Sequence, residues 1–228
     1  MRVTGDGKGP TVDLLTLPGV LAPISDSRLL ADIVAAQPIG AGSEVLDVGT
    51  GSGVVALAAA RTGATATAVD VSRRAILTVR LNAWRNGLRV QARRGRTYGP
   101  VAGQRFDLIA SNPPYVPSSS DQLPARGPQR AWEGGLDGRA IVDELCDGAV
   151  DHLRPGGAIL LVHSALIGEA ATVDRLRAGG LRDVEVIVRH RGPLGPLMRA
   201  QQRAGRVPSG TDEEDVIVVR GVAPTPPR

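Results

Sequence analysis

Short apolar runs alternate with helical segments from residue 41 onward, and this alternation constrains the fold of the 228-residue chain more than any other feature. Alternation of this kind predicts a mainly parallel, twisted α/β sheet with helices on both faces. The last two runs are joined by a long stretch that we expect to be a loop, which predicts an antiparallel hairpin at the sheet edge. The seven predicted strands are residues 44–48, 64–69, 89–93, 106–111, 157–162, 184–189 and 215–220.

The helices are expected near residues 27–36, 54–61, 73–86 and 139–153, with Asp26 or Ser27 capping the first. A chain of this length buries a sizeable core in one unit. We therefore expect a single domain at 1–221, made of an N-terminal arm and helix (1–40) and a core (41–221). Residues 1–10 are expected to be a loose start and 222–228 a flexible tail.

Composition excludes several classes of protein. The net charge is only +4, and aromatic residues make up 2% of the chain, which argues against a base-stacking platform for nucleic acid. The single cysteine, Cys146, is expected to be a buried hydrophobe, and the three histidines lack ligand spacing, so no metal is expected. No leader or membrane-spanning stretch is evident, and we expect a cytoplasmic protein without membrane contact.

A glycine-rich turn, Gly49 to Gly53, follows the first predicted strand and precedes a helix. Glycines let a ligand approach the backbone, and the start of the helix offers unpaired N–H groups. The dinucleotide fingerprint needs glycine or alanine three places after its second glycine, where this chain has Val54, so NAD is disfavoured. No Gly-Lys-Ser/Thr follows, which excludes a nucleoside triphosphate loop.

Asp70 ends the second predicted strand, 70 − 49 = 21 positions after Gly49. A carboxylate about 20 residues after such a loop binds a ribose diol in this architecture. The alternative is structural, because Asp70 or Ser72 can cap the helix that follows.

The segment Ser111-Asn112-Pro113-Pro114-Tyr115 ends the fourth predicted strand. Two prolines remove two backbone donors and turn the chain rigidly outward. The Asn112 side-chain oxygen and the Pro113 carbonyl can then accept from one nitrogen that bears two hydrogens, while Tyr115 offers a flat face. A plain proline turn is the alternative, and the glycine-rich turn upstream decides against it.

These motifs resemble those of the class I S-adenosylmethionine-dependent methyltransferases, and within them the HemK-like N5-glutamine methyltransferases that modify release factors. The resemblance covers nearly the whole chain. It includes the segment Pro23–Ser27, the Gly-Gly-Leu-Asp-Gly stretch at 134–138 and the turn at 153–157. It implies a Rossmann-like methyltransferase fold.

The resemblance also implies an activity and a set of site residues. The expected reaction is methylation of a glutamine amide in a protein such as a release factor, with Asp47 holding the methionine end of the cofactor. Asn112, Pro113, Pro114 and Tyr115 are the expected catalytic residues. S-adenosylmethionine is expected to be bound by Asp47, Gly49, Thr50, Gly51, Gly53, Asp70, Val71 and Asn112.

The sequence departs from the family pattern in two ways. About forty residues precede the glycine loop, as in the compact branch known from archaea and eukaryotes, whose members often need a small zinc-binding activator. Arg96 stands where the family usually has aspartate, and it cannot accept a hydrogen bond from adenine. Thr97 or a backbone carbonyl is expected to take that role.

Two other functions remain open at this level. The first is methylation of nucleic acid, because an exocyclic amine such as N6 of adenine donates to the same two acceptors as an amide. The second is a noncatalytic methyltransferase-like module, which the departure from the family pattern at Arg96 suggests. Residues 116–130 are expected to form a rim or lid. The late arginines are expected to be solvated or to dock RNA or an acidic protein; they are Arg189, Arg191, Arg199, Arg203 and Arg206.

Overall fold

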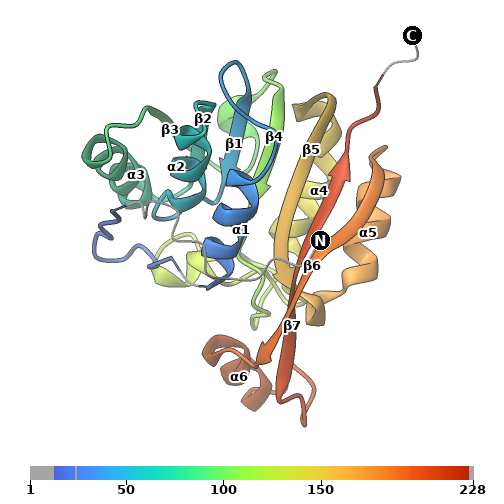
Figure 1. Ribbon diagram of the computed structural model, residues 1–228. Coiled ribbons are helices and arrows are strands. Elements are labelled where there is room, and N and C mark those ends of the chain that lie inside the picture. Colours follow the sequence, from blue (N-terminus) through green and yellow to red (C-terminus); the bar gives the residue numbers. More distant parts are fainter. Residues whose placement is uncertain (1–12, 24, 226–228) are drawn as a thin grey trace.

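The computed structural model describes residues 13–23 and 25–225, and these contain a seven-stranded sheet (Figure 1). Residues 1–10, Ile24 and the last three residues of the expected tail lie outside the described residues. The strands are β1 (Glu44–Val48), β2 (Thr65–Asp70), β3 (Val90–Arg94), β4 (Phe106–Ser111), β5 (Leu153–Ser164), β6 (Arg182–Pro193) and β7 (Glu213–Val222). The helices are α1 (Ser25–Ala35), α2 (Val54–Arg61), α3 (Arg73–Arg85), α4 (Ala140–His152), α5 (Glu169–Ala178) and α6 (Pro196–Arg203).

The strand order is β3-β2-β1-β4-β5-β7-β6, and the predicted fold class is confirmed. The first five strands in this order pair in parallel, as helical crossovers require. β7 pairs antiparallel with β5 and with β6, so the expected edge hairpin is present. The order reverses between β1 and β4, which makes their carboxyl ends the switch point where ligands bind in such sheets.

Alternation along the strands divides the core into two layers. In β1, Val45 packs with α1, α2 and α3, whereas Leu46 packs on the opposite face with α4 and α5. The central strands are buried on both faces, which explains their almost continuous apolar sequence. No helix in the described part of the chain is long and apolar enough to cross a membrane.

Three predictions about local structure are wrong. The stretch between β6 and β7 is not a plain loop, since it contains α6; Figure 1 shows β6 and β7 extending past the other strands and carrying α6 at their tip. α1 begins at Ser25, so Asp26 and Ser27 lie inside the helix and are not its N-cap. Their side chains instead accept hydrogen bonds from Tyr115 and Asn112, which follow β4.

The third correction concerns the tail, which starts later than expected. β7 runs through Val222, and the N–H of Ala223 donates to the Gly157 carbonyl at 2.8 Å. Ala223 is buried. Val222 therefore belongs to β7, and Ala223 is still fixed by its hydrogen bond to β5.

Candidate functional site

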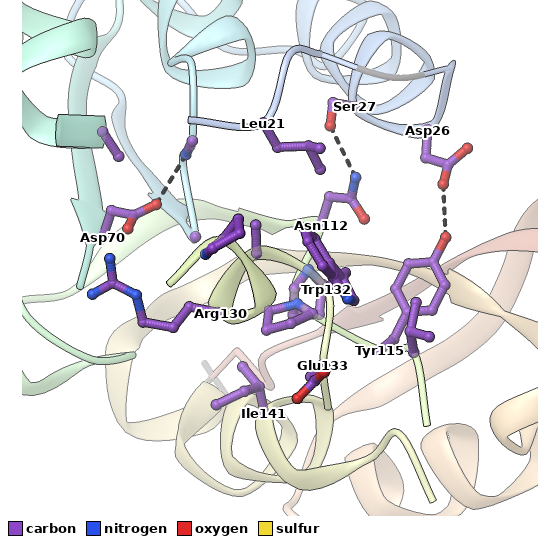
Figure 2. A pocket seen from close by; sticks show the side chains of 18 of the residues that line it. Leu21, Asp26, Ser27, Asp70, Asn112, Tyr115, Arg130, Trp132, Glu133 and Ile141 are labelled. Carbon is purple, nitrogen blue, oxygen red and sulfur yellow. Dashed lines mark hydrogen bonds between the residues drawn. The ribbon is translucent and has the colours of Figure 1, made fainter. Parts of the chain in front are cut away.

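A cavity of about 780 Å³ opens at the carboxyl ends of β1, β2 and β4 (Figure 2). Five parts of the chain that are far apart in sequence contribute to its walls. They are residues 19–23 with 25–27, the glycine loop 48–52 with residues 70–72 and 94–97, the segment 111–116, a stretch between Leu123 and Glu133 that includes part of the predicted rim, and the arm formed by β6, α6 and β7.

The glycine loop is held in place from below by a buried carboxylate. Asp47 accepts hydrogen bonds from the Thr50 hydroxyl at 2.6 Å and from the Ala56 N–H at 3.0 Å. Burial raises the pKa of Asp47 to about 7, although both hydrogen bonds oppose this shift. Asp47 does not line the cavity; it organises the turn that does.

Gly53 also lies outside the cavity wall. Its φ is +88°, and a Cβ atom there would come within 3.0 Å of the Val79 side chain. The residue therefore allows α2 to start close to α3. Of the expected cofactor residues, six line the cavity, namely Gly49, Thr50, Gly51, Asp70, Val71 and Asn112.

Asp70 lies beside the glycine loop at the cavity wall. Its carboxylate accepts from the Gly51 N–H at 3.1 Å and from the Ser72 N–H at 2.7 Å. The N-cap of α3 is Ser72, so Asp70 does not have the capping role that was its structural alternative. Burial raises the pKa of Asp70, and Arg130, which points toward it in Figure 2, works against the rise.

Asn112 and Tyr115 are held by the first turn of α1. The Asn112 amide nitrogen donates to the Ser27 hydroxyl at 2.9 Å, and the Tyr115 hydroxyl donates to Asp26 at 2.7 Å (Figure 2). The first bond orients the Asn112 carboxamide, so that its oxygen is turned away from Ser27. Within the described residues, neither that oxygen nor the Pro113 carbonyl accepts a hydrogen bond. Both oxygens are thus left without a donor from the described residues.

The Gly-Gly-Leu-Asp-Gly stretch supports this segment from behind. Val116 donates to the Trp132 carbonyl at 2.7 Å, and Gly134 donates to the Val116 carbonyl at 2.9 Å. A Cβ at Gly134 would lie 2.8 Å from the Pro114 carbonyl oxygen, and one at Gly138 would lie 2.3 Å from that of Tyr115. Glycine is required at both positions because the two backbones touch.

The sequence did not reveal the wall formed by residues 19–23, which the preceding residues anchor. Buried Asn82 of α3 exchanges two hydrogen bonds with the backbone of Leu15, at 2.8 and 2.9 Å, and also donates to the Ser52 carbonyl. The Asn82 side chain thus joins the N-terminal segment to the glycine loop, and this attachment places Leu21 at the cavity. A lone asparagine within a predicted helix gives no such signal by itself.

Arg96, the departure from the family pattern, is paired with Glu144 of α4, and the Thr97 hydroxyl donates to the same carboxylate. Both residues line the cavity. Thr97 has a φ of +42°, a conformation that costs free energy for a side chain branched at Cβ. The ion pair and this hydrogen bond hold the loop in that shape.

The arm of β6, α6 and β7 closes the cavity opposite the glycine loop. Leu194, Met198 and Val207 pack against Val116, with Trp132 beside them. Two of the late arginines lie on β6 rather than in a loop: Arg189 pairs with Glu169 and Asp215, and Arg191 pairs with Glu213. The arm thus places a second, largely apolar wall next to Tyr115.

A seven-stranded sheet that ends in an antiparallel hairpin, with a cavity above its switch point, defines a class I methyltransferase fold. A methyltransferase from Pyrococcus furiosus has this fold with a TM-score of 0.62 at 20% identity, covering 93% of this chain and 89% of that one. A Thermus thermophilus 16S rRNA N2 G1207 methyltransferase, solved with AdoMet and guanosine, matches with a TM-score of 0.58 at 20% identity. That match covers 91% of this chain and 46% of the other.

Sequence comparisons identify the family to which the chain belongs within the class I methyltransferases. Residues 12–125 match the family described as methyltransferase small domain. A release factor glutamine methyltransferase of Gloeobacter violaceus is 39% identical over 71% of this chain and 59% of its own length. A Methanocaldococcus jannaschii protein, provisionally named a protein N5-glutamine methyltransferase, is 32% identical over 79% of this chain and 90% of its own.

The chain belongs to the family of protein N5-glutamine methyltransferases. It spans about three fifths of the length of the release factor enzymes from Gloeobacter and from Geobacter sulfurreducens.

Proposed function

We propose that this protein transfers a methyl group from S-adenosylmethionine to the side-chain amide nitrogen of a glutamine in another protein. The observation that carries the proposal is the orientation of Asn112. Its amide nitrogen is bound to Ser27, so its oxygen and the Pro113 carbonyl are left as acceptors beside the cavity. A primary amide supplies the two hydrogens that such a pair of acceptors binds.

The residues around the cavity fit the cofactor. Each Asp70 oxygen accepts one backbone N–H and retains a lone pair for a ribose hydroxyl. Gly49, Thr50 and Gly51 let a ligand approach the backbone, and Val71, at 37% exposure, offers apolar surface beside Asp70 for the adenine ring. Because the Arg96 side chain is paired with Glu144, we assign adenine recognition to backbone groups of this loop.

When bound, S-adenosylmethionine would supply a methyl group on a positively charged sulfur, which loses its charge on transfer. The amide nitrogen gains the methyl group and loses one proton, which leaves to water. An amide nitrogen is a weak nucleophile because its lone pair is delocalised, so positioning must do most of the work. Well-oriented reactants gain about 7 to 11 kcal/mol in this way. Asn112 and the Pro113 carbonyl orient the amide, Pro114 keeps the turn rigid, and Tyr115, fixed by Asp26, packs against it.

Tyr115 remains neutral in this role. Its pKa is raised well above the ordinary value, first by burial and then by the carboxylates of Asp26 and Glu214. The tyrosine therefore serves as a packing surface and a hydrogen-bond donor to Asp26, and we give it no part in proton transfer.

The acceptor we propose is a translation release factor that exposes a Gly-Gly-Gln turn. Relatives of this chain are named release factor glutamine methyltransferases, and one from Bradyrhizobium diazoefficiens, 39% identical over 124 residues, is named a ribosomal protein uL3 glutamine methyltransferase. The glycines of such a turn would let the backbone bend and bring the glutamine into the cavity.

One observation favours a nucleic-acid acceptor as the second candidate. A neighbouring hollow of about 440 Å³ is lined by Arg73, Arg74, Arg94 and Arg130, and none of them forms an ion pair with another described residue. Unpaired guanidinium groups attract phosphates. The exocyclic amine of adenine would satisfy the same two acceptors as an amide.

The test is to incubate the purified protein with radiolabelled S-adenosylmethionine and a release factor, with ribosomal protein uL3, RNA and DNA in parallel. We expect one methyl group on the glutamine of the release factor by mass spectrometry, and no label when that glutamine is replaced by glutamate or alanine. Label on adenine with the proteins unmodified would favour the second candidate. Calorimetry showing no cofactor binding would leave a noncatalytic module.

A small activator subunit, a cytoplasmic location and the organisation as a single domain remain predictions. The labelling assay addresses the first, because addition of a cell extract to an inactive preparation would reveal a missing subunit.

A further inference from the structure

Glu214 has no role in the reaction as described so far, yet it lines the cavity. It lies on β7 opposite Gly192 of β6, where the arm leaves the main sheet. Its carboxylate is close enough to Tyr115 to contribute to the raised pKa of that hydroxyl, after burial and Asp26. Glu214 therefore belongs to the acceptor side of the cavity.

The two oxygens of Glu214 have different surroundings. Oε1 accepts from the Gly195 N–H at 2.8 Å, immediately before α6. Oε2 is buried and has no hydrogen-bond partner among the described residues. His163 Nε2 is also buried without a partner, but it lies inside the core and does not line the cavity.

An unpaired buried carboxylate oxygen is costly unless a donor comes to it. No described residue donates a hydrogen bond to Oε2. The wall beside it is formed by apolar Val116, Leu194 and Met198, and Asp26 and Glu133 at this end are acidic. His190 of β6 also lines the cavity, diagonally across the β6–β7 pair from Glu214, but it forms no hydrogen bond with this carboxylate. Arg191, also on β6, pairs with Glu213. The unpaired oxygen lies at the cavity wall, where a bound ligand has access to it.

We propose that Glu214 is a specificity-determining residue that accepts a hydrogen bond from an N–H group of the acceptor protein next to the target glutamine. The inference rests on the proposed function and deepens it. A carboxylate accepts and never donates when ionised, so the matching group is a backbone N–H or a cationic side chain. The target amide is bound by Asn112 and the Pro113 carbonyl, so Glu214 contacts the segment that carries it.

Glu214→Gln is the informative variant. Glutamine has the same shape and can still accept from Gly195 with its oxygen, but it then presents an NH₂ group, a donor, where Oε2 was. The matched control is Glu213→Gln on the same strand, because Glu213 is exposed and pairs with Arg191. The measurements are initial rates against release factor concentration at saturating cofactor, calorimetric affinity for S-adenosylmethionine, and thermal unfolding.

We expect Glu214→Gln to raise the KM for the release factor about 10- to 100-fold, the loss expected for a hydrogen bond to a charged group. The kcat at saturation, the cofactor affinity and the unfolding temperature should stay close to wild type, and Glu213→Gln should match wild type throughout. If the donor is a cationic side chain, the KM effect shrinks at high salt and disappears when basic residues flanking the glutamine are neutralised. If it is a backbone N–H, the effect survives both changes.

Two results would overturn the inference. An unchanged KM in Glu214→Gln, with the wild type active, would show that Oε2 meets no acceptor protein. A parallel fall in kcat, cofactor affinity and unfolding temperature would show that the residue only holds α6. A wild-type protein that binds the cofactor but methylates no glutamine would instead refute the proposed function, so the two failures are distinguishable.

Discussion

Replacing Gly138 by alanine tests the contact that places the acceptor segment. Gly138 has a φ of +80°, and a Cβ atom there would lie 2.3 Å from the Tyr115 carbonyl oxygen and 2.9 Å from the Ile167 side chain. The left-handed conformation costs alanine about 1 to 2 kcal/mol, and forcing a methyl group into a packed site costs about 1 to 3 kcal/mol more. We expect Gly138→Ala to lower the free energy of unfolding by about 2 to 5 kcal/mol.

Gly103→Ala is the matched control. Gly103 has a φ of +75°, and no atom lies within 4 Å of a Cβ built there, so this variant carries the conformational cost without the contact. The difference between the two variants in equilibrium urea unfolding measures the contact alone, and we expect about 1 to 3 kcal/mol.

The same substitution should affect the site selectively. The Tyr115 backbone must move away from residue 138, which disturbs the hydrogen bond from its hydroxyl to Asp26. Turnover of the acceptor should fall, whereas S-adenosylmethionine affinity should change little, because Asp70 and the glycine loop lie on the other side of the cavity (Figure 2). Equal unfolding free energies for Gly138→Ala and Gly103→Ala would refute the argument.

Three further predictions concern the other side chains of the site. Asp70→Ala should weaken S-adenosylmethionine binding by about 1.5 to 3 kcal/mol in calorimetry; unchanged affinity in a folded variant would remove Asp70 from the site. Asn112→Ala should abolish most turnover while cofactor affinity stays within a few fold, and Ser27→Ala should lower turnover less, since it frees the Asn112 carboxamide without removing it; wild-type turnover in Asn112→Ala would refute the acceptor pair. Because burial raises the pKa of Asp47 to about 7, the folded protein keeps a proton that the unfolded chain releases above about pH 4, so this carboxyl's contribution to stability is lost as pH rises from about 4 to 7. Asp47→Asn should flatten that part of the urea-unfolding profile by about 3 to 5 kcal/mol, and an unchanged slope would show that Asp47 is already ionised.

The sequence alone determined the features that depend on neighbours along the chain. The strand periodicity predicted the sheet, and β1 and β4 have the predicted bounds. The glycine loop, Asp70 at the end of β2 and the Asn-Pro-Pro-Tyr turn could be placed at one edge because parallel strands bring their carboxyl ends together.

Only the tertiary structure decided how those groups are held. Asn112 meets Ser27 and Tyr115 meets Asp26 across 85 and 89 residues of chain, and no local pattern encodes such pairs. Asp47, expected in the cavity, lies beneath the loop because the turn above needs a buried acceptor for Thr50 and Ala56.

The helix α6 also depends on contacts between residues that are far apart in the sequence. Eight residues that begin with proline carry a weak helical signal, and such a short helix is marginal by itself. It is stabilised by packing of Met198 on Val116, which is remote in sequence, and by the Glu214 carboxylate that binds Gly195 before its first turn. Short-range patterning therefore predicted the strands of the sheet and the segments of the candidate site, whereas contacts between distant segments formed α6 and decided which side chains were left free to bind.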